Sequence, residues 1–305
     1  MKKVRGVHTA IVTPFDAKGG LDEEGLVRNL HFQMHHGVDG IVALGTTGES
    51  PTLLPFERER IILRCVAETN GKTLLTVGTG SYSTQQTIEH TLQAEDLGAD
   101  MALVVTPYYN KPTQEGLYRH FKAVSEAVGI PIIIYNIQGR TSQNLQTDTL
   151  KRLADLPNIT GIKEASGNIL QINEVMELIA RHRPSFSVMS GDDCLTLSVM
   201  ALGGDGVISV VSNLIPAQIK ALVQAFDRGD YAAARDLHYQ LMPLFRGAFI
   251  ETNPIPIKAA MNLCGMAAGG CRLPLCELLP ENAKKLHELL LKELNEKDLK
   301  GFMYR

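Results

Sequence analysis

Short apolar runs, rich in β-branched residues, recur at regular intervals along the chain. Each run is followed by a turn and then by a longer segment in which apolar residues repeat with helical spacing. Several runs are apolar throughout, such as Ile132-Ile133-Ile134, which is typical of parallel strands covered on both faces. The pattern predicts eight strands, at residues 7–12, 40–44, 74–78, 101–106, 131–136, 159–163, 186–190 and 206–210.

Amphipathic segments that predict helices lie between these strands. Asp22 and Thr84 stand where helices begin, and Gly98 and Gly129 stand where helices end, which are the positions that these residue types favour. The predicted helices include residues 57–69, 84–97, 114–128 and 170–180.

An eightfold alternation of strand and helix without a break in composition predicts a closed (β/α)8 TIM barrel. The alternative is an open Rossmann-like sheet, but no GxGxxG fingerprint follows the first strand. After the eighth unit, helical patterns continue at residues 216–226, 231–245, 256–263 and 281–297, and the last three exceed what a barrel needs. We therefore expect a barrel over residues 1–228 and a C-terminal helical extension, residues 229–305, packed on it.

The balance of charge favours small-molecule chemistry. With 30 basic and 33 acidic residues, the chain has a formal net charge of −3, so it offers no excess of positive charge to a nucleic acid or an anionic membrane. The first residues lack a sustained apolar segment, and no apolar run approaches the length of a membrane span. A cytoplasmic location is expected.

The five cysteines form no CxxC pair, and no histidines stand beside them at zinc-binding spacing. We interpret them as buried free thiols rather than as metal ligands or disulfide partners, and no metal site is predicted. The residues concerned are Cys65, Cys194, Cys264, Cys271 and Cys276.

Active sites of such barrels lie at the C-terminal ends of the strands, so polar residues there are the first candidates. The second strand ends in the glycine- and threonine-rich stretch 45–50, which either binds a small anion through its N–H and hydroxyl groups or is simply a turn. The fourth ends in a proline-flanked loop with Tyr108 and Tyr109, which are suited to catalysis or to packing. The fifth ends near Tyr135 and Arg140. Tyr135 could move a proton and Arg140 could bind a carboxylate; alternatively, the tyrosine is only packed and the arginine lies on the surface.

The sixth strand carries the sharpest signal, Lys163. Alternation along the strand places Gly161, Lys163 and Ala165 on one face and Ile162 and Glu164 on the other, so the adjacent glutamate is a poor partner for the lysine. Burial in the barrel mouth would lower the pKa of the amine and make it nucleophilic. The alternative is an ordinary ion pair with Asp192 or Asp193 after the seventh strand.

Taken in order, these motifs resemble those of the dihydrodipicolinate synthase and N-acetylneuraminate lyase family. The resemblance rests on residues 45–50, 106–112, 135, 139–141 and 161–167, and it extends from residues 10–15 to residues 253–258 and 272–274. It implies a Schiff-base lyase that condenses pyruvate with aspartate semialdehyde. No metal or organic cofactor is then expected, since the covalent imine with Lys163 is the electron sink, and a homotetramer built as a dimer of dimers is expected.

The resemblance also implies roles for particular residues. Tyr109 would be supplied across a subunit interface. The implied roles are a nucleophile at Lys163, a proton relay at Tyr135, Thr46 and Tyr109, a pyruvate site at Thr47 and Ile208, and a semialdehyde site at Arg140 and Gly191.

Two other functions stay open at this point. The first is a related pyruvate-dependent aldolase or dehydratase that acts on a sugar acid. Residues 139–141 match the synthase pattern instead, but Gln138 replaces a proline that is common in the family shortly before Arg140. A third reading is a barrel that binds a small acid without Schiff-base chemistry.

Some relatives are inhibited by lysine at a dimer interface, and the resemblance maps that site onto seven residues. Lysine-sensitive members have Glu, Asn and His where this chain has Gln86, Tyr82 and Arg58. We therefore expect weak or absent lysine feedback. The mapped residues are Ser50, Pro51, Pro55, Arg58, Tyr82, Gln86 and Tyr108.

Overall fold

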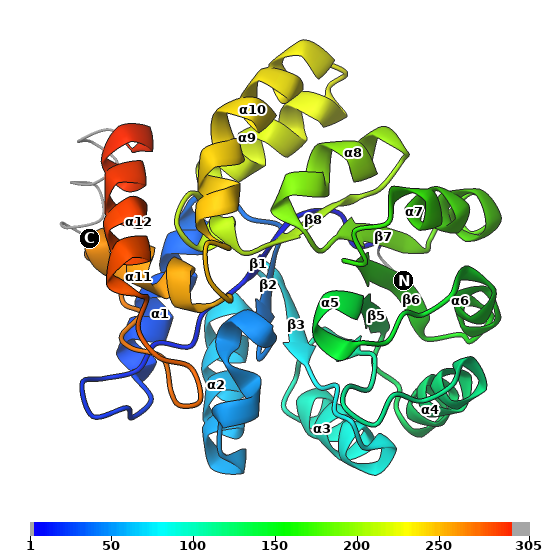
Figure 1. The fold of residues 1–305 in the computed structure, drawn as a ribbon. Coiled ribbons are helices and arrows are strands. Elements are labelled where there is room, and N and C mark those ends of the chain that lie inside the picture. The colour runs from blue at the N-terminus through cyan, green and yellow to red at the C-terminus, as the bar shows by residue number, and fades with distance from the viewer. Residues whose placement is uncertain (1–2, 295–305) are drawn as a thin grey trace.

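Eight parallel strands close into a barrel in chain order, with β8 pairing back onto β1 (Figure 1). The computed structural model describes residues 3–294. All eight predicted strands are confirmed, with ends that move by one or two residues, and the closed barrel excludes the open sheet. The strands are β1 Gly6–Ala10, β2 Gly40–Ala43, β3 Leu74–Gly78, β4 Met101–Val105, β5 Ile132–Asn136, β6 Ile159–Glu164, β7 Ser187–Ser190 and β8 Gly206–Ser209.

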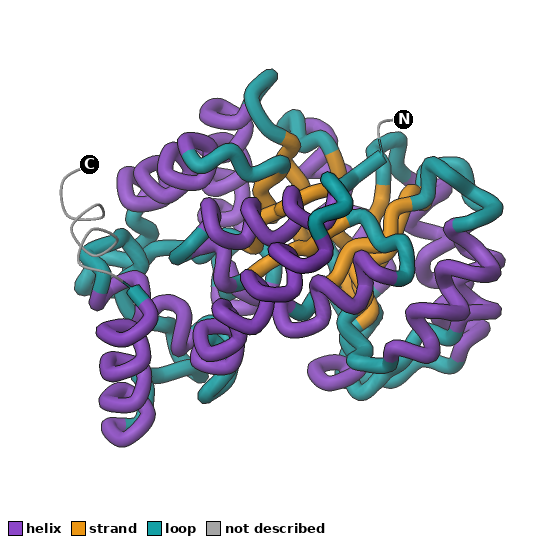
Figure 2. Tube along the Cα trace, turned by 90° about the horizontal axis from the view of Figure 1, so that it is seen from above, coloured by secondary structure: helices purple, strands orange, loops and turns teal. Residues whose placement is uncertain are grey.

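The helices form an outer ring around these strands (Figure 1), and in the view turned by 90° they flank the strands (Figure 2). The helices predicted at 57–69, 84–97 and 114–128 are confirmed, and the segment predicted at 170–180 begins as α7 and continues as a π-helical turn, Met176–Ala180. The ring consists of α1 Glu23–His35, α2 Pro55–Thr69, α3 Thr84–Asp96, α4 Gln114–Ala127, α6 Thr147–Ala154, α7 Ile169–Val175, α8 Thr196–Ala201 and α9 Pro216–Asp227. The short helix α5 Gln138–Thr141 lies inside this ring, next to β5 (Figure 1).

The helix ends confirm two of the four predicted boundary residues. The Asp22 side chain caps α1, and Gly98 adopts a positive φ of 96° after α3. Thr84 is not a cap, because Ser83 accepts the first-turn N–H and Thr84 is the first helical residue of α3. Gly129 is not a left-handed cap either; its N–H donates to the Glu95 side chain instead.

Alternation along the strands separates two apolar layers. One layer lies between strands and helices, and the other fills the barrel interior. The interior layer includes Ala10, Val42, Leu103, Ile133, Tyr135, Met189 and Ile208. The barrel is therefore a filled core, and only its mouth is available for chemistry.

The C-terminal extension consists of α10 Tyr231–Gly247, α11 Ile255–Leu263 and α12 Pro280–Glu293, which lie on one side of the barrel (Figure 1). The helices predicted at 231–245 and 256–263 are confirmed; of the one predicted at 281–297, residues 295–297 lie outside the described part. Phe245, Ile257 and Leu286 belong to the same buried cluster as Val7 and Leu30 of the barrel. Because the two parts share one core, we propose a barrel over residues 1–228 with residues 229–305 as an appendage.

Within residues 3–294, no helix is long and apolar enough to cross a membrane. All five cysteines are free, but the prediction that all are buried is wrong: Cys65 and Cys264 are buried, Cys194 and Cys271 are half-buried, and Cys276 is exposed. Cys276 lies in the irregular segment between α11 and α12, where periodicity gave no measure of depth.

Candidate active site

Lys163 and Tyr135 stand side by side where β5 and β6 reach the barrel mouth. The two strands are paired in register, with Tyr135 opposite Lys163. Ile162 packs in the outer layer, and the Glu164 carboxylate accepts hydrogen bonds from the Asn136 side chain and the Ser166 N–H. The alternation predicted from the sequence is therefore present, and it turns Glu164 away from the lysine.

Lys163 is a buried amine with no counter-ion among residues 3–294. The residue is 5% exposed, and its Nζ lies 4.2 Å from the centre of the Tyr135 ring. Within the described residues no carboxylate forms an ion pair with it, so the alternative of a pair with Asp192 or Asp193 is wrong. Burial lowers the pKa of Lys163 to about 7, and the charge of Asp193 opposes this only in part.

Asp193 is occupied by the end of β8. Its carboxylate accepts hydrogen bonds from the Ser209 hydroxyl at 2.5 Å and from the N–H groups of Val210 at 2.9 Å and Val211 at 3.3 Å. Burial nevertheless raises its pKa. This carboxylate fixes the backbone that follows Ile208 rather than binding the lysine.

Gly191, directly after β7, makes room for the lysine side chain. A Cβ at this position would lie 2.8 Å from Cβ of Ala165 and 3.0 Å from Cε of Lys163. Any larger residue would displace the amine, so glycine is a steric requirement here.

Tyr135 is buried, and its side chain hydrogen-bonds with that of Thr46 across the mouth. Burial raises the pKa of Tyr135 to about 12, while Arg140 and Thr46 act in the opposite direction. The phenol therefore stays protonated at neutral pH. The structure thus brings together Lys163, Tyr135 and Thr46.

The turn that carries Thr46 and Thr47 is a short 3₁₀ helix, Thr46–Gly48, between two residues in the left-handed region. Leu44 has φ 56° and Glu49 has φ 52°, which is unfavourable for residues with a Cβ. Surrounding contacts must hold the turn in this conformation.

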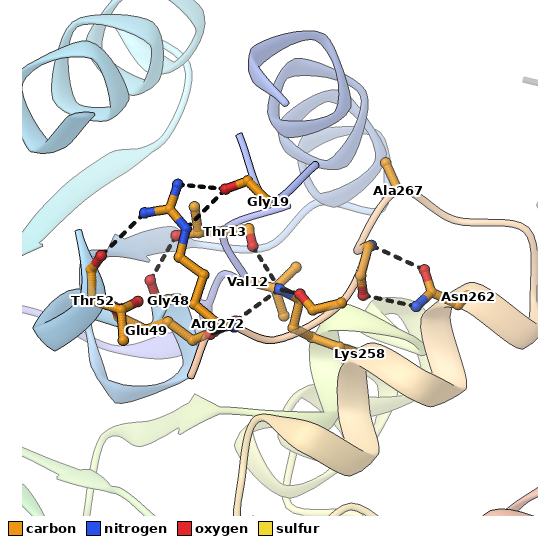
Figure 3. Close-up of polar contacts among 12 residues, drawn as sticks. Val12, Thr13, Gly19, Gly48, Glu49, Thr52, Lys258, Asn262, Ala267 and Arg272 are labelled. Atoms are coloured by element: carbon orange, nitrogen blue, oxygen red, sulfur yellow. Dashed lines mark hydrogen bonds and ion pairs between the residues drawn. The ribbon is translucent and has the colours of Figure 1, made fainter. Parts of the chain in front are cut away.

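A buried network from the C-terminal extension supplies those contacts (Figure 3). Lys258 of α11 donates to a Glu49 carboxylate oxygen at 2.7 Å and to the carbonyls of Thr13 and Gly270. The Arg272 N–H donates to the other Glu49 oxygen at 2.9 Å, and its guanidinium binds Glu57 and the carbonyls of Gly19 and Thr52. The turn is thus clamped from outside the barrel.

Asn253 connects the same turn to Arg140. Its side-chain Nδ2 donates to Oγ1 of Thr47 at 3.0 Å, and its carbonyl oxygen accepts from the exposed guanidinium of Arg140 at 3.0 Å. Sequence reasoning did not assign Asn253 a role. The only signal was its place in residues 253–258, which contribute to the family resemblance.

Tyr109 is not part of this assembly. It is 91% exposed, and its backbone has a positive φ of 70°. Tyr108 is half-buried and packs edge-on against Tyr82, with ring centres 5.5 Å apart. Within the described chain, the predicted relay therefore contains two of its three hydroxyls.

The residues mapped to a lysine site lie around the start of α2 and the loops after β3 and β4. Arg58 is buried, donates to the Gly78 carbonyl at 3.1 Å and forms no ion pair within residues 3–294. The Gln86 side chain accepts from the Ser81 hydroxyl. This region holds a buried cation and a neutral amide.

A metal site is not evident in the described part of the chain, where no three His, Cys, Asp or Glu side chains are grouped to hold an ion. A desolvated lysine beside a buried tyrosine at the mouth of a (β/α)8 barrel is typical of enzymes that bind a carbonyl substrate as an imine. The model of the dihydrodipicolinate synthetase family matches residues 3–293, and the chain belongs to this family.

Individual relatives agree over nearly the whole chain. The 4-hydroxy-tetrahydrodipicolinate synthase of Protochlamydia amoebophila is 56% identical over 287 residues, which cover 94% of this chain and 96% of the relative. That of Methanococcus vannielii is 48% identical over 288 residues, 94% and 98% of the two chains. The crystal structure of dihydrodipicolinate synthase from Thermotoga maritima superposes with a TM-score of 0.93 at 46% identity, covering 95% and 98%.

Proposed function

We propose that the chain condenses pyruvate with aspartate 4-semialdehyde to give 4-hydroxy-tetrahydrodipicolinate, the lyase reaction of lysine and diaminopimelate biosynthesis for which its relatives are named. The observation that carries the proposal is Lys163, which is buried, has no ion-pair partner in the described part of the chain and has a pKa lowered to about 7. A large fraction of this amine is neutral near pH 7, so it can attack a ketone.

The reaction begins at Nζ of Lys163, which adds to the ketone carbon of pyruvate. Loss of water gives an imine, and loss of a methyl proton gives an enamine. The enamine carbon then attacks the aldehyde of the second substrate. Finally the substrate amine adds to the imine carbon, which closes the ring and releases the lysine.

Each step moves a proton, and we assign this work to Tyr135 and Thr46 with Tyr109. The Tyr135–Thr46 hydrogen bond and the protonated state of Tyr135 support the first two assignments. Tyr109 is exposed on its own chain, so it would complete the relay in the site of a second copy. This assignment requires an oligomer, and we propose a homotetramer built as a dimer of dimers.

Two donor sites would hold the substrate acids. Thr47 and the backbone at Ile208 are assigned to the pyruvate carboxylate, and Arg140 is assigned to the carboxylate of the semialdehyde. Gly191 would line the pocket beside the lysine. No cofactor enters this scheme, because the imine nitrogen accepts the electron pair. The cytoplasmic location of the protein stays a prediction.

Borohydride reduction in the presence of pyruvate tests the proposal. The expected result is one covalent pyruvyl adduct per chain, located by mass spectrometry on Lys163 and not on the other buried lysine, Lys258. A barrel that merely binds small acids would give no adduct. Product formation with aspartate semialdehyde, compared with aldehydes of sugar acids, then distinguishes the synthase from a related aldolase.

Complementation tests the role of Tyr109. Tyr109→Phe and Lys163→Met chains should each be nearly inactive alone. When the two are co-expressed, hybrid oligomers contain sites with an intact lysine from one chain and an intact tyrosine from the other, so activity should return. No recovery, despite hybrid formation, would show that Tyr109 does not act across the interface, and an active Tyr109→Phe chain would place it outside the relay.

A further inference from the structure

Asn253 touches both of the proposed carboxylate sites, although it lies in the extension between α10 and α11. It is 4% exposed; its side chain donates to Thr47, and its backbone carbonyl accepts from Arg140. Thr47 and Arg140 come from the second and fifth strand ends and make no direct contact in the hydrogen-bond pattern of residues 3–294. A single residue of the appendage therefore links the two sites.

The direction of the Asn253–Thr47 hydrogen bond decides what Thr47 can do. A hydroxyl has one proton to donate. Because Thr47 accepts from the amide of Asn253, its own proton stays available to another acceptor, such as a carboxylate. The reverse orientation of the amide would consume that proton.

The amide also has an unsatisfied atom. Oδ1 of Asn253 is buried and has no hydrogen-bond partner among the described residues. A buried acceptor without a partner is destabilising, so stability alone does not explain an asparagine here. The reverse orientation would instead leave the NH₂ group, with two donors, unsatisfied.

The remainder of the turn is held separately. Lys258 and Arg272 fix Glu49 at the far end of the turn, as Figure 3 shows. The extension thus sets the backbone of the turn through one contact set and the hydroxyl of Thr47 through another. Removal of the Asn253 side chain should leave the first set intact.

We propose that Asn253 is a positioning residue. Its side chain orients the Thr47 hydroxyl as a donor to the pyruvate carboxylate, and its carbonyl anchors Arg140 for the second substrate. This inference rests on the proposed function. A substitution of Asn253 removes its side chain but keeps its backbone carbonyl. It should therefore change the binding of pyruvate and leave the binding of the semialdehyde unchanged.

Asn253→Ala tests the inference by the pyruvate dependence of borohydride trapping. The half-saturating pyruvate concentration should rise about five- to tenfold, the effect of one hydrogen bond. The KM for the semialdehyde should stay within about twofold, since the carbonyl that anchors Arg140 remains. The adduct should still form on Lys163.

Asn253→Asp keeps the shape but makes both side-chain atoms acceptors. Thr47 would then donate to the new carboxylate, and the negative charge would oppose pyruvate. The rise in half-saturating pyruvate should therefore exceed that of Asn253→Ala. In a Thr47→Val background, Asn253→Ala should have no further effect on pyruvate.

Asn262→Ala is the matched control. Asn262 lies on α11, where its side chain makes two hydrogen bonds to the Gly269 backbone at 2.9 and 3.1 Å, away from Thr47. Its loss should lower thermal stability without changing the pyruvate dependence.

Several outcomes would overturn the inference. One is an unchanged pyruvate dependence in Asn253→Ala while the unsubstituted chain traps pyruvate. A second is an equal loss of affinity for both substrates, which would indicate general disruption of the site. A third is that the effects of the Thr47 and Asn253 substitutions on pyruvate are independent of each other. By contrast, failure of the unsubstituted chain to trap pyruvate would contradict the proposed function itself.

Discussion

Among residues 3–294, two lysines are buried near the mouth of the barrel, and they differ in their polar partners. Lys163 is 5% exposed and has no carboxylate partner in the described chain, whereas Lys258 is 1% exposed and donates to Glu49 and to two carbonyls. Burial lowers the pKa of both, but at Lys258 the adjacent Glu49 opposes the shift. The two lysines thus share burial and differ in their counter-ion, and the proposed reactivity of Lys163 depends on that difference.

Backbone geometry explains which lysine receives a partner. Glu164 is adjacent to Lys163 in sequence, yet strand alternation directs it to the opposite face. Glu49 and Lys258 are 209 positions apart, and a left-handed residue at the end of a turn places the carboxylate against α11. The backbone therefore directs Glu164 away from Lys163 and places Glu49 next to Lys258.

Lys163→Met should have the largest effect on chemistry. Without the amine no imine forms, so trapping should vanish and turnover should fall by roughly 10³-fold or more. Stability should not decrease, because a buried amine without a partner is replaced by an apolar side chain of similar length. Mass spectrometry after borohydride treatment and a thermal melt measure the two effects; an adduct elsewhere in the variant would remove Lys163 from its role.

Lys258→Met should do the reverse. It leaves Glu49 as a buried carboxylate without its cation, which typically lowers the free energy of unfolding by about 3–5 kcal/mol. Denaturant unfolding measures this loss, and the folded fraction should still trap pyruvate on Lys163. Lys258→Met combined with Glu49→Gln should recover part of the stability. If Lys258→Met lost pyruvate trapping but kept its stability, Lys258 would have a role in the chemistry rather than in holding the fold.

Arg140→Ala should mainly affect the second substrate. The specificity constant for the semialdehyde should fall roughly ten- to a hundredfold, the effect of charge-assisted hydrogen bonds to a carboxylate. Pyruvate trapping should be spared, since Arg140 is not in the proposed pyruvate site. Steady-state kinetics in both substrates check this, and an unchanged dependence on the semialdehyde would contradict the assignment.

The depressed pKa of Lys163 predicts how trapping depends on pH. With a pKa of about 7, roughly a tenth of the amine is neutral at pH 6 and roughly nine-tenths at pH 8. Initial rates of single-turnover trapping should therefore rise nearly tenfold over this range and then level off. Tyr135, with its pKa raised to about 12, should not titrate within it.

The same shift has a consequence for stability. Between about 7 and the ordinary value of 10.5, the unfolded chain binds a proton at Lys163 that the folded chain does not, so this residue favours folding more as pH rises. Lys163→Met should remove that part of the pH dependence. Trapping rates that rise roughly a hundredfold from pH 6 to pH 8 without levelling off would mean that the amine keeps its ordinary pKa of 10.5 and is not desolvated.

The local features of the molecule could be predicted from sequence, and the distant contacts could not. The period of two along the sixth strand was enough to turn Lys163 inward and Glu164 outward, and apolar runs located every strand. The roles of Asn253 and Lys258 depend on contacts more than 200 positions away, for which periodicity has no signal. For the same reason the sequence left an ion pair of Lys163 with Asp192 or Asp193 open as an alternative, whereas the Asp193 carboxylate accepts hydrogen bonds from the end of β8.

The smallest expected effect concerns lysine inhibition, and it involves a third buried cation. Arg58 has a buried Nε without a hydrogen-bond partner and no acidic neighbour in an ion pair within the described chain. Gln86, which accepts from Ser81, offers a neutral amide where lysine-sensitive relatives would have a carboxylate.

A lysine effector would therefore bring ammonium groups to a buried guanidinium without gaining a negative partner. Loss of one charge-assisted contact weakens binding by roughly ten- to a hundredfold, before repulsion is added. Millimolar lysine should leave the condensation rate nearly unchanged, whereas Gln86→Glu with Arg58→His should become measurably sensitive. Strong inhibition of the unsubstituted chain at submillimolar lysine would contradict this expectation. It would show that groups from a second copy offset the charge of Arg58, which would then differ from Lys163 in having a partner.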